Sequence, residues 1–151
     1  MESKLDQAKY WFLEGATYRG DLHLIVSEGK LGEPSKPSDF PIGGDIFGGA
    51  RPLEVHEDSA TLRIVFEKPI AWQVVDESYT TWDEYEVCDD KNKLKILSRS
   101  RYLDYVKKNH DWFEDIAGPA QHYRVWTLDE VVDVIAHDPP TIENWVRNDL
   151  A

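Results

Sequence analysis

Apolar residues occupy every second position over much of the chain, and this period of two predicts β-strands. Residues 22–27 show it clearly, with Leu22, Leu24 and Val26 on one side of the expected strand. Polar turns separate the further expected strands, which are residues 53–56, 61–67, 70–76, 84–88 and 94–98. The last two of these strands bracket the polar residues 89–93 and predict a hairpin.

Two other segments show helical spacing. Residues 2–13 carry apolar side chains three and four positions apart, and Ser3 is placed to cap the resulting short helix. Ser100 is placed to cap a second helix that ends near Asn109. Residues 111–117 are expected to add one more helical turn.

The segment after residue 120 carries two opposing signals. Residues 127–130 read as a capping box, which favours a helix, whereas the β-branched residues of 131–136 favour a strand. We favour two strands, residues 122–127 and 131–136. The sequence therefore predicts an α+β fold, with a mainly antiparallel sheet or partly closed barrel of six to eight strands and two or three short helices.

A single domain over residues 1–151 is expected, with a long loop rich in glycine and proline at residues 29–52. Its central part, residues 41–49, has the glycine content of a phosphate-binding loop. No Lys-Ser or Lys-Thr pair follows it, and it does not lead from a strand into a helix. We interpret this loop as a structural or partner-contacting segment.

The composition indicates an acidic domain with a large aromatic content. The formal net charge is −12 and the pI is near 4.7, which argues against binding nucleic acid through the whole surface. The single cysteine, Cys88, excludes an internal disulfide. The first residues lack the apolar run of a signal or membrane span, so we expect a cytoplasmic protein with no membrane contact.

No catalytic motif is found, and the sequence leaves open whether the chain is an enzyme. The five histidines form no His-x-His or His-x-x-x-His pair, so we expect no metal and no cofactor. Cys88 lies beside two aspartates that would raise the pKa of its thiol, which disfavours a role as nucleophile. With 29 acidic residues, chance pairs of carboxylates carry no signal of glycoside hydrolysis.

Charge is distributed unevenly in the middle of the chain. Residues 76–90 contain seven acids and no base, whereas residues 91–108 contain seven bases and one acid. Aromatic side chains are mixed with the acids, and aromatic anchors with a charged rim are typical of protein interfaces. The candidate partner-binding residues are Asp76, Glu77, Tyr79, Trp82, Asp83, Glu84 and Glu86.

The last third of the chain resembles small, acidic, uncharacterised bacterial proteins, some of which resemble the immunity proteins of toxin–immunity pairs. The resemblance is carried by residues 121–135, by residues 139–142 and by residues 100–106. It implies a binding protein that neutralises a toxin by covering it. It contains no catalytic signature, so no functional residue is carried over.

The first hypothesis is therefore a non-enzymatic protein-binding domain of bacterial type that engages a basic protein partner through its acidic face. The alternative is a small-ligand-binding or enzymatic domain with a cavity covered by residues 29–52. A third hypothesis is homo-oligomerisation, with the acidic stretch of one copy meeting the basic stretch of another.

Overall fold

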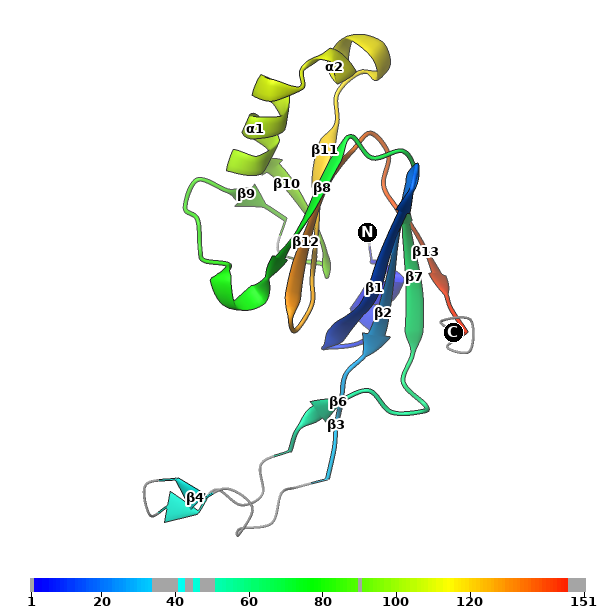
Figure 1. Ribbon diagram of the computed structural model, residues 1–151, viewed down its shortest axis with the longest axis vertical. Coiled ribbons are helices and arrows are strands. Elements are labelled where there is room, and N and C mark those ends of the chain that lie inside the picture. The colour runs from blue at the N-terminus through cyan, green and yellow to red at the C-terminus, as the bar shows by residue number, and fades with distance from the viewer. Residues whose placement is uncertain (1, 34–40, 43–44, 47–50, 90, 147–151) are drawn as a thin grey trace.

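Two antiparallel β-sheets face each other, and two helices cover the outer side of one of them (Figure 1). The structure is a computed structural model, and it describes residues 2–33, 41–42, 45–46, 51–89 and 91–146. The four-stranded sheet has the order β1 (Trp11–Arg19), β2 (Asp21–Glu28), β7 (Thr61–Phe66), β13 (Thr141–Asn144). The five-stranded sheet has the order β8 (Ala71–Asp76), β12 (Glu130–Ala136), β11 (Gln121–Trp126), β10 (Leu94–Arg99), β9 (Val87–Cys88).

Smaller elements complete the described structure. The helices are the 3-10 turns η1 (Lys4–Gln7) and η2 (Glu77–Tyr79) and the α-helices α1 (Arg101–Asn109) and α2 (Trp112–Ala117). Two short ladders pair β3 (Lys30–Leu31) with β6 (Leu53–Glu54), and β4 (Pro41–Ile42) with β5 (Asp45–Ile46). In Figure 1 both ladders project away from the two sheets.

The main core lies between the sheets, because each contributes its apolar face. Phe66 of the four-stranded sheet packs against Tyr123 of the five-stranded sheet, with ring centroids 5.7 Å apart. The other buried residues of this core are Leu5, Trp11, Leu22, Leu24, Val26, Leu62, Ile64, Val125, Val132, Val134 and Ala136. Burial of these side chains is the main term that stabilises the sandwich.

A second, smaller core lies beneath the helices, where Leu103 and Val106 of α1 pack with Ala120 and Ile135. Strands β11 and β12 therefore bury side chains on both faces, apolar groups towards the other sheet and mixed groups towards the helices. This arrangement explains why residues 131–136 are apolar at nearly every position.

The structure confirms a mixed α+β fold with antiparallel sheets. It also confirms the hairpin of β9 and β10, the Ser100 cap of α1, and the strand interpretation of residues 131–136. The described strands form no closed barrel. The partly closed barrel and the single-domain organisation stay predictions.

The prediction of a helix at residues 2–13 is wrong. Ser3 does form a capping box with Asp6, but the helix is a single 3-10 turn, and the backbone is extended again at Ala8. Trp11 then begins β1 as a buried residue, and its indole N–H donates to the Leu5 carbonyl over 2.8 Å. Tertiary packing of this strand therefore overrides the local helical spacing.

Several strands pair with segments that lie far from them in the sequence. Strand β6 pairs with β3, whereas β7 pairs with β2 and β13. Strand β13 was missed, because Pro139 and Pro140 end β12 and hide the strand that follows. Most of the expected loop at residues 29–52, including the four glycines of residues 41–49, lies outside the described residues.

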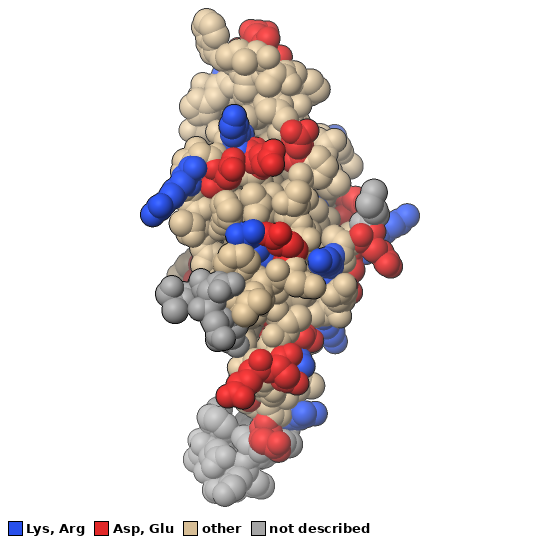
Figure 2. Space-filling view, turned by 90° about the vertical axis from the view of Figure 1, so that its right-hand side faces the viewer, with Lys and Arg blue, Asp and Glu red and all other residues tan. Residues whose placement is uncertain are grey.

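Charged side chains of both signs are interspersed on the face that carries the four-stranded sheet (Figure 2). Opposite charges pair across its strands, as in the Arg63–Glu143 pair between β7 and β13. No helix within the described residues is both long and apolar enough to cross a membrane.

Candidate functional site

The predicted site residues gather on one segment beside the five-stranded sheet. Six of them lie on residues 77–89, here called the acidic loop, which runs from η2 to β9. The seventh, Asp76, ends β8, and its carboxylate accepts a hydrogen bond of 2.9 Å from the backbone N–H of Ser78. This bond caps η2 and starts the loop.

Ion pairs and hydrogen bonds anchor the acidic loop to the body. Arg124 of β11 donates to Glu86 from two nitrogens, at 2.8 and 3.0 Å. The Nε of Arg101 donates to Asp83 over 3.0 Å. The Nε of Arg99 donates to the Tyr85 carbonyl over 2.6 Å, so the loop is held at three successive points.

Tyr85 adds an aromatic element to this anchoring. Its hydroxyl donates to the carboxylate of Asp104, and this hydrogen bond raises the pKa of the Tyr85 phenol. The guanidinium groups of Arg99 and Arg101 lie 4.8 and 5.1 Å from its ring centroid. The acidic and basic stretches of the sequence thus pair within one chain, which leaves fewer charges for pairing between copies.

Arg124 also reaches the interior. Its Nε donates over 2.7 Å to Asp133, which in turn accepts hydrogen bonds from His122 at 2.6 Å and from Gln73 at 3.2 Å. The other ring nitrogen of His122 lies 2.7 Å from the Ser100 hydroxyl. Ser100, His122, Asp133, Arg124 and Glu86 therefore form one continuous polar network from the cap of α1 to the acidic loop.

The serine, histidine and aspartate of this network have the residue types of a catalytic triad, yet their surroundings indicate a structural role. Ser100 and His122 have an exposed fraction of 0%. Ser100 Oγ accepts the backbone N–H of Leu103 over 3.0 Å, as an N-cap does. His122 Nε2 faces Asp133 and Nδ1 faces the Ser100 hydroxyl, whereas a triad serine bonds Nε2. A substrate has no access to this hydroxyl.

The pKa values of the network follow from burial and pairing. Burial alone would raise the pKa of Asp133, but hydrogen bonds from His122 and Arg124 hold it below its ordinary value. Burial opposes the charge of Arg124, but its bonds to Glu86 and Asp133 raise its pKa. Asp133 and Arg124 therefore stay ionised inside the protein, and the single positive charge of Arg124 faces two carboxylates, those of Asp133 and Glu86.

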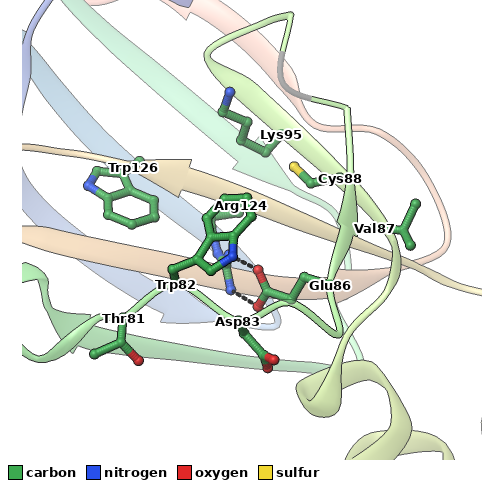
Figure 3. Close-up of a pocket in the computed structure, with 9 residues that line it drawn as sticks. All are labelled: Thr81, Trp82, Asp83, Glu86, Val87, Cys88, Lys95, Arg124 and Trp126. Carbon is green, nitrogen blue, oxygen red and sulfur yellow. Dashed lines mark hydrogen bonds and ion pairs between the residues drawn. The ribbon is translucent and has the colours of Figure 1, made fainter.

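A pocket of about 490 Å³ lies between the acidic loop and the outer face of the five-stranded sheet. Lys95, Arg124 and Trp126 line it from the sheet, and Trp82 with Glu86 and Cys88 lines it from the loop (Figure 3). Lys95 and Arg124 are cross-strand neighbours on β10 and β11, and Trp126 follows two residues later on the same face. Strand alternation therefore places all three side chains on the pocket side.

A second pocket of about 420 Å³ adjoins the first. The two pockets share Lys95 and Trp126, so together they form one groove. Its second half is also lined by the following residues: Lys9, Tyr10, Trp11, Glu77, Lys93, Thr127 and Leu128. The sequence interpretation missed this groove, because its cations come from segments 84 residues apart.

Two aromatic side chains of the acidic loop are almost fully open to solvent. The exposed fraction is 81% for Tyr79 and 84% for Trp82. Large aromatic side chains are usually buried, so the exposure of two of them on an anchored loop is unusual. Glu84 is exposed on the same loop.

Carboxylates also gather where β8 and β12 end. Asp76 and Glu130 are register partners, and Asp129 and Glu77 are joined by a backbone hydrogen bond of 2.8 Å. Burial and the neighbouring charges of Asp129 and Asp76 raise the pKa of Glu130. Asp83 and Glu86, in contrast, are paired with arginines. The predicted acidic face therefore contains acids that are paired with arginines and acids that repel one another.

The remaining histidines lie apart from the groove. His56 pairs with Glu54 at 2.9 Å, and His137 lies 3.1 Å from the Pro119 carbonyl. Within the described residues, no group of three or more His, Cys, Asp and Glu side chains is arranged to hold a metal ion. Cys88 is half-buried in the pocket lining.

Comparisons of the chain with protein-family models, with curated proteins and with solved structures find no match. The resemblance to immunity proteins in the last third of the chain thus stays a prediction.

Proposed function

We propose that the chain is a non-enzymatic protein-binding domain that engages a basic partner through the acidic loop. The observation that carries this proposal is the exposure of Tyr79 and Trp82, at 81% and 84%, on a loop that is fixed to the body. Aromatic anchors surrounded by charge dominate the energetics of many protein interfaces. The proposed surface also includes Asp76, Glu77 and Glu84.

Anchoring of the loop favours binding because less conformational entropy is lost when the partner docks. The Arg101–Asp83 pair holds the residue that follows Trp82, and the bidentate Arg124–Glu86 pair holds the loop three residues further on. Glu86 and Asp83, which the sequence suggested as contact residues, therefore position the loop, and the contact itself is assigned to Tyr79, Trp82 and Glu84.

The carboxylates at the ends of β8 and β12 supply the electrostatic part of the proposal. Burial and, after it, the charges of Asp129 and Asp76 raise the pKa of Glu130, and a cationic surface that docks beside these carboxylates would relieve their repulsion. A basic partner would also be attracted over a distance, which raises the association rate at low salt. In its narrower form, the proposal is a cytoplasmic bacterial immunity protein that covers a basic toxin.

The experiment compares the Tyr79→Ala/Trp82→Ala double variant with Trp112→Ala, a matched control on α2 that removes a side chain 76% exposed elsewhere. Each protein is used to capture partners from an extract of the source organism. The partners that are purified are those that the unmodified chain and the control retain and the double variant loses. Their association rates are then measured at low and high salt. We expect a basic partner with a salt-sensitive rate, and equal retention by all three proteins would refute the proposal.

The narrower form has its own test. The chain is expressed together with the product of the neighbouring reading frame, and growth of the host is measured. We expect protection by the unmodified chain and by Trp112→Ala, and loss of protection with the double variant. A neighbouring product that is harmless to the host when expressed without the chain would refute the immunity role and leave the wider proposal standing.

A further inference from the structure

Strand β8 is the outermost strand of the five-stranded sheet, and within the described part of the chain it has a neighbouring strand on one side only. The Glu77 backbone N–H donates to the Asp129 carbonyl over 2.8 Å, and from this pair the bonds of an antiparallel ladder involve every second residue. Gln73 therefore bonds to β12, whereas the N–H and C=O groups of Trp72 and Val74 point away from it. An unpaired row of this kind can accept a further strand.

The other edges of the two sheets carry features that oppose pairing with another chain. Strand β1 has an interrupted register with β2, and the carbonyl of Trp11 accepts the N–H of Leu128 over 2.9 Å. Strand β9 has two residues, and β13 carries the charged Glu143. Strand β8, in contrast, has six residues in a regular register with β12, and residues 71–75 are uncharged.

The side chains of Trp72 and Val74 make this edge apolar. Both face the four-stranded sheet, because their register partners are the buried core residues Val134 and Val132. Val74 is nevertheless 41% exposed, and Trp72 is half-buried with its ring centroid 6.1 Å from that of Tyr18 on β1. An added strand would therefore find an apolar face to extend as well as open backbone groups.

Carboxylates gather at the C-terminal end of this edge. Asp76 ends β8, and its register partner Glu130 begins β12 next to the exposed Asp129. Burial raises the pKa of Glu130, and the charges of Asp129 and Asp76 raise it further. The residues that precede β8, Glu67 and Lys68, are exposed and carry opposite charges. A strand laid along β8 is therefore favoured by basic residues at the Asp76 end.

We infer that β8 takes up an extended basic segment of the proposed protein partner as an additional antiparallel strand. The backbone of the segment pairs with Trp72 and Val74, and its basic end lies beside Asp76. Strand β8 continues directly into η2 and the acidic loop, so the strand edge and the exposed aromatic residues form one surface. The inference rests on the proposed function, because it describes how the same partner docks.

The test is an NMR titration of the isotope-labelled chain with the peptide Lys-Lys-Val-Thr-Val-Thr-Val, whose basic end lies beside Asp76 in an antiparallel pair. The control peptide has the same composition in reverse order. We expect the first peptide to bind with a dissociation constant of about 1 mM or below, at least about fivefold more tightly than the control. The amides of Trp72 and Val74 should shift and exchange more slowly, whereas that of Gln73, which already bonds to β12, should keep its exchange rate.

Variants then locate the binding edge. Val74→Lys places a charge on this edge and should weaken binding of the first peptide at least about tenfold. Val87→Lys is the matched control, because Val87 is 47% exposed on β9, the opposite edge of the same sheet, and its replacement should leave the affinity unchanged. Asp76→Asn should reduce the preference for the first peptide over the reversed one. Circular dichroism verifies folding, and the amide shifts of the unmodified chain keep the test decisive if Val74→Lys does not fold.

Four results would overturn the inference: no binding of the first peptide at about millimolar concentration, equal binding of both peptides, unaffected amides at Trp72 and Val74, or an unchanged affinity in Val74→Lys. Dimerisation of the free chain that Val74→Lys abolishes would also overturn it, because this edge would then belong to a second copy.

The failure of this inference is distinguishable from the failure of the proposed function. The Tyr79→Ala/Trp82→Ala variant should lose capture of the protein partner and still bind the first peptide, because neither side chain lies on β8. A partner that the unmodified chain and Val74→Lys capture equally would support the proposed function and refute the added strand.

Discussion

Arg124 donates two hydrogen bonds, of 2.8 and 3.0 Å, to the carboxylate of Glu86, and this pair joins the five-stranded sheet to the acidic loop. The same guanidinium donates to buried Asp133. The position of the loop is thereby coupled to the polar interior of the sheet. Because the exposed aromatic residues and one wall of the groove are parts of this loop, the proposed protein-binding surface depends on the pair.

We expect Glu86→Gln to loosen the loop and to lower the free energy of unfolding by about 1.5–3 kcal/mol, the usual contribution of hydrogen bonds to a charged group. Arg124 is left with Asp133 as its remaining carboxylate. Urea denaturation measures the loss, and faster hydrogen exchange of loop amides such as that of Tyr85 localises it. Asp83→Asn is the control, because its partner Arg101 is exposed and such pairs contribute about 0–1 kcal/mol. Equal losses in both variants would contradict a special role for Glu86.

Asp133→Asn should be more damaging, by about 3–5 kcal/mol, because it leaves the charge of Arg124 partly uncompensated in the interior. The pKa of Asp133 is lowered in the folded protein, so its ionised form stabilises the fold above the unfolded-state pKa, and this stability is lost as the pH falls through the folded-state value.

Denaturant melts between pH 7 and pH 2, at about one-unit intervals, should therefore show a flatter acid dependence for Asp133→Asn than for the unmodified chain. Asp115→Asn, which changes an exposed acid of α2, serves as control and should keep the original slope. An unaltered acid slope in Asp133→Asn would mean that other carboxylates govern acid unfolding.

The raised pKa of Tyr102 leads us to expect a change in stability at high pH. Burial and the charge of Asp133 raise its pKa to about 12. A raised folded-state pKa contributes stability that is complete below the unfolded value of about 10 and is lost as the pH rises towards 12. Tyr102→Phe should therefore reduce the loss of stability over this interval, measured as the thermal midpoint against pH. Tyr105→Phe, on the exposed side of the same helix, should not.

Local signals were sufficient for several elements of this fold. Ser100 was recognised as a cap because serine stands directly before residues with helical spacing, and the hairpin around residues 89–93 is marked by its polar turn. Ser3 was also recognised as a cap, but the length of its helix was misjudged. A cap determines where a helix begins, whereas packing of Trp11 between the sheets determines where this one ends.

The polar network could have been found only from a correct strand register. His122 and Asp133 are diagonal neighbours on the paired strands β11 and β12 and are 11 residues apart in the sequence. Arg124 is the direct cross-strand partner of Asp133. Strand alternation puts all three on one face once this register is known. The competing capping-box signal at residues 127–130 favoured a helix, so these side chains could not be paired from the amino-acid pattern alone.

Glu130 offers a substitution that separates stability from binding. Its pKa is raised by burial and by the charges of Asp129 and Asp76, so its stabilising contribution is present below the unfolded-state pKa and lost as the pH rises through the folded-state value. Its Oε2 atom is buried without a hydrogen-bond partner among the described residues. At pH 7 the ionised form thus opposes folding, and Glu130→Gln should raise the thermal midpoint slightly, an advantage that should vanish near pH 3.

If the carboxylates at the ends of β8 and β12 attract a basic partner, the same Glu130→Gln variant should associate with that partner more slowly at low salt, although it is the more stable protein. Glu57→Gln is a suitable control, because it removes one exposed acid near β6, away from this surface. If the variant gains stability and still associates at the original rate, the negative charge of Glu130 serves no binding function. Slower association combined with higher stability is the outcome expected where charge repulsion is retained because a partner relieves it.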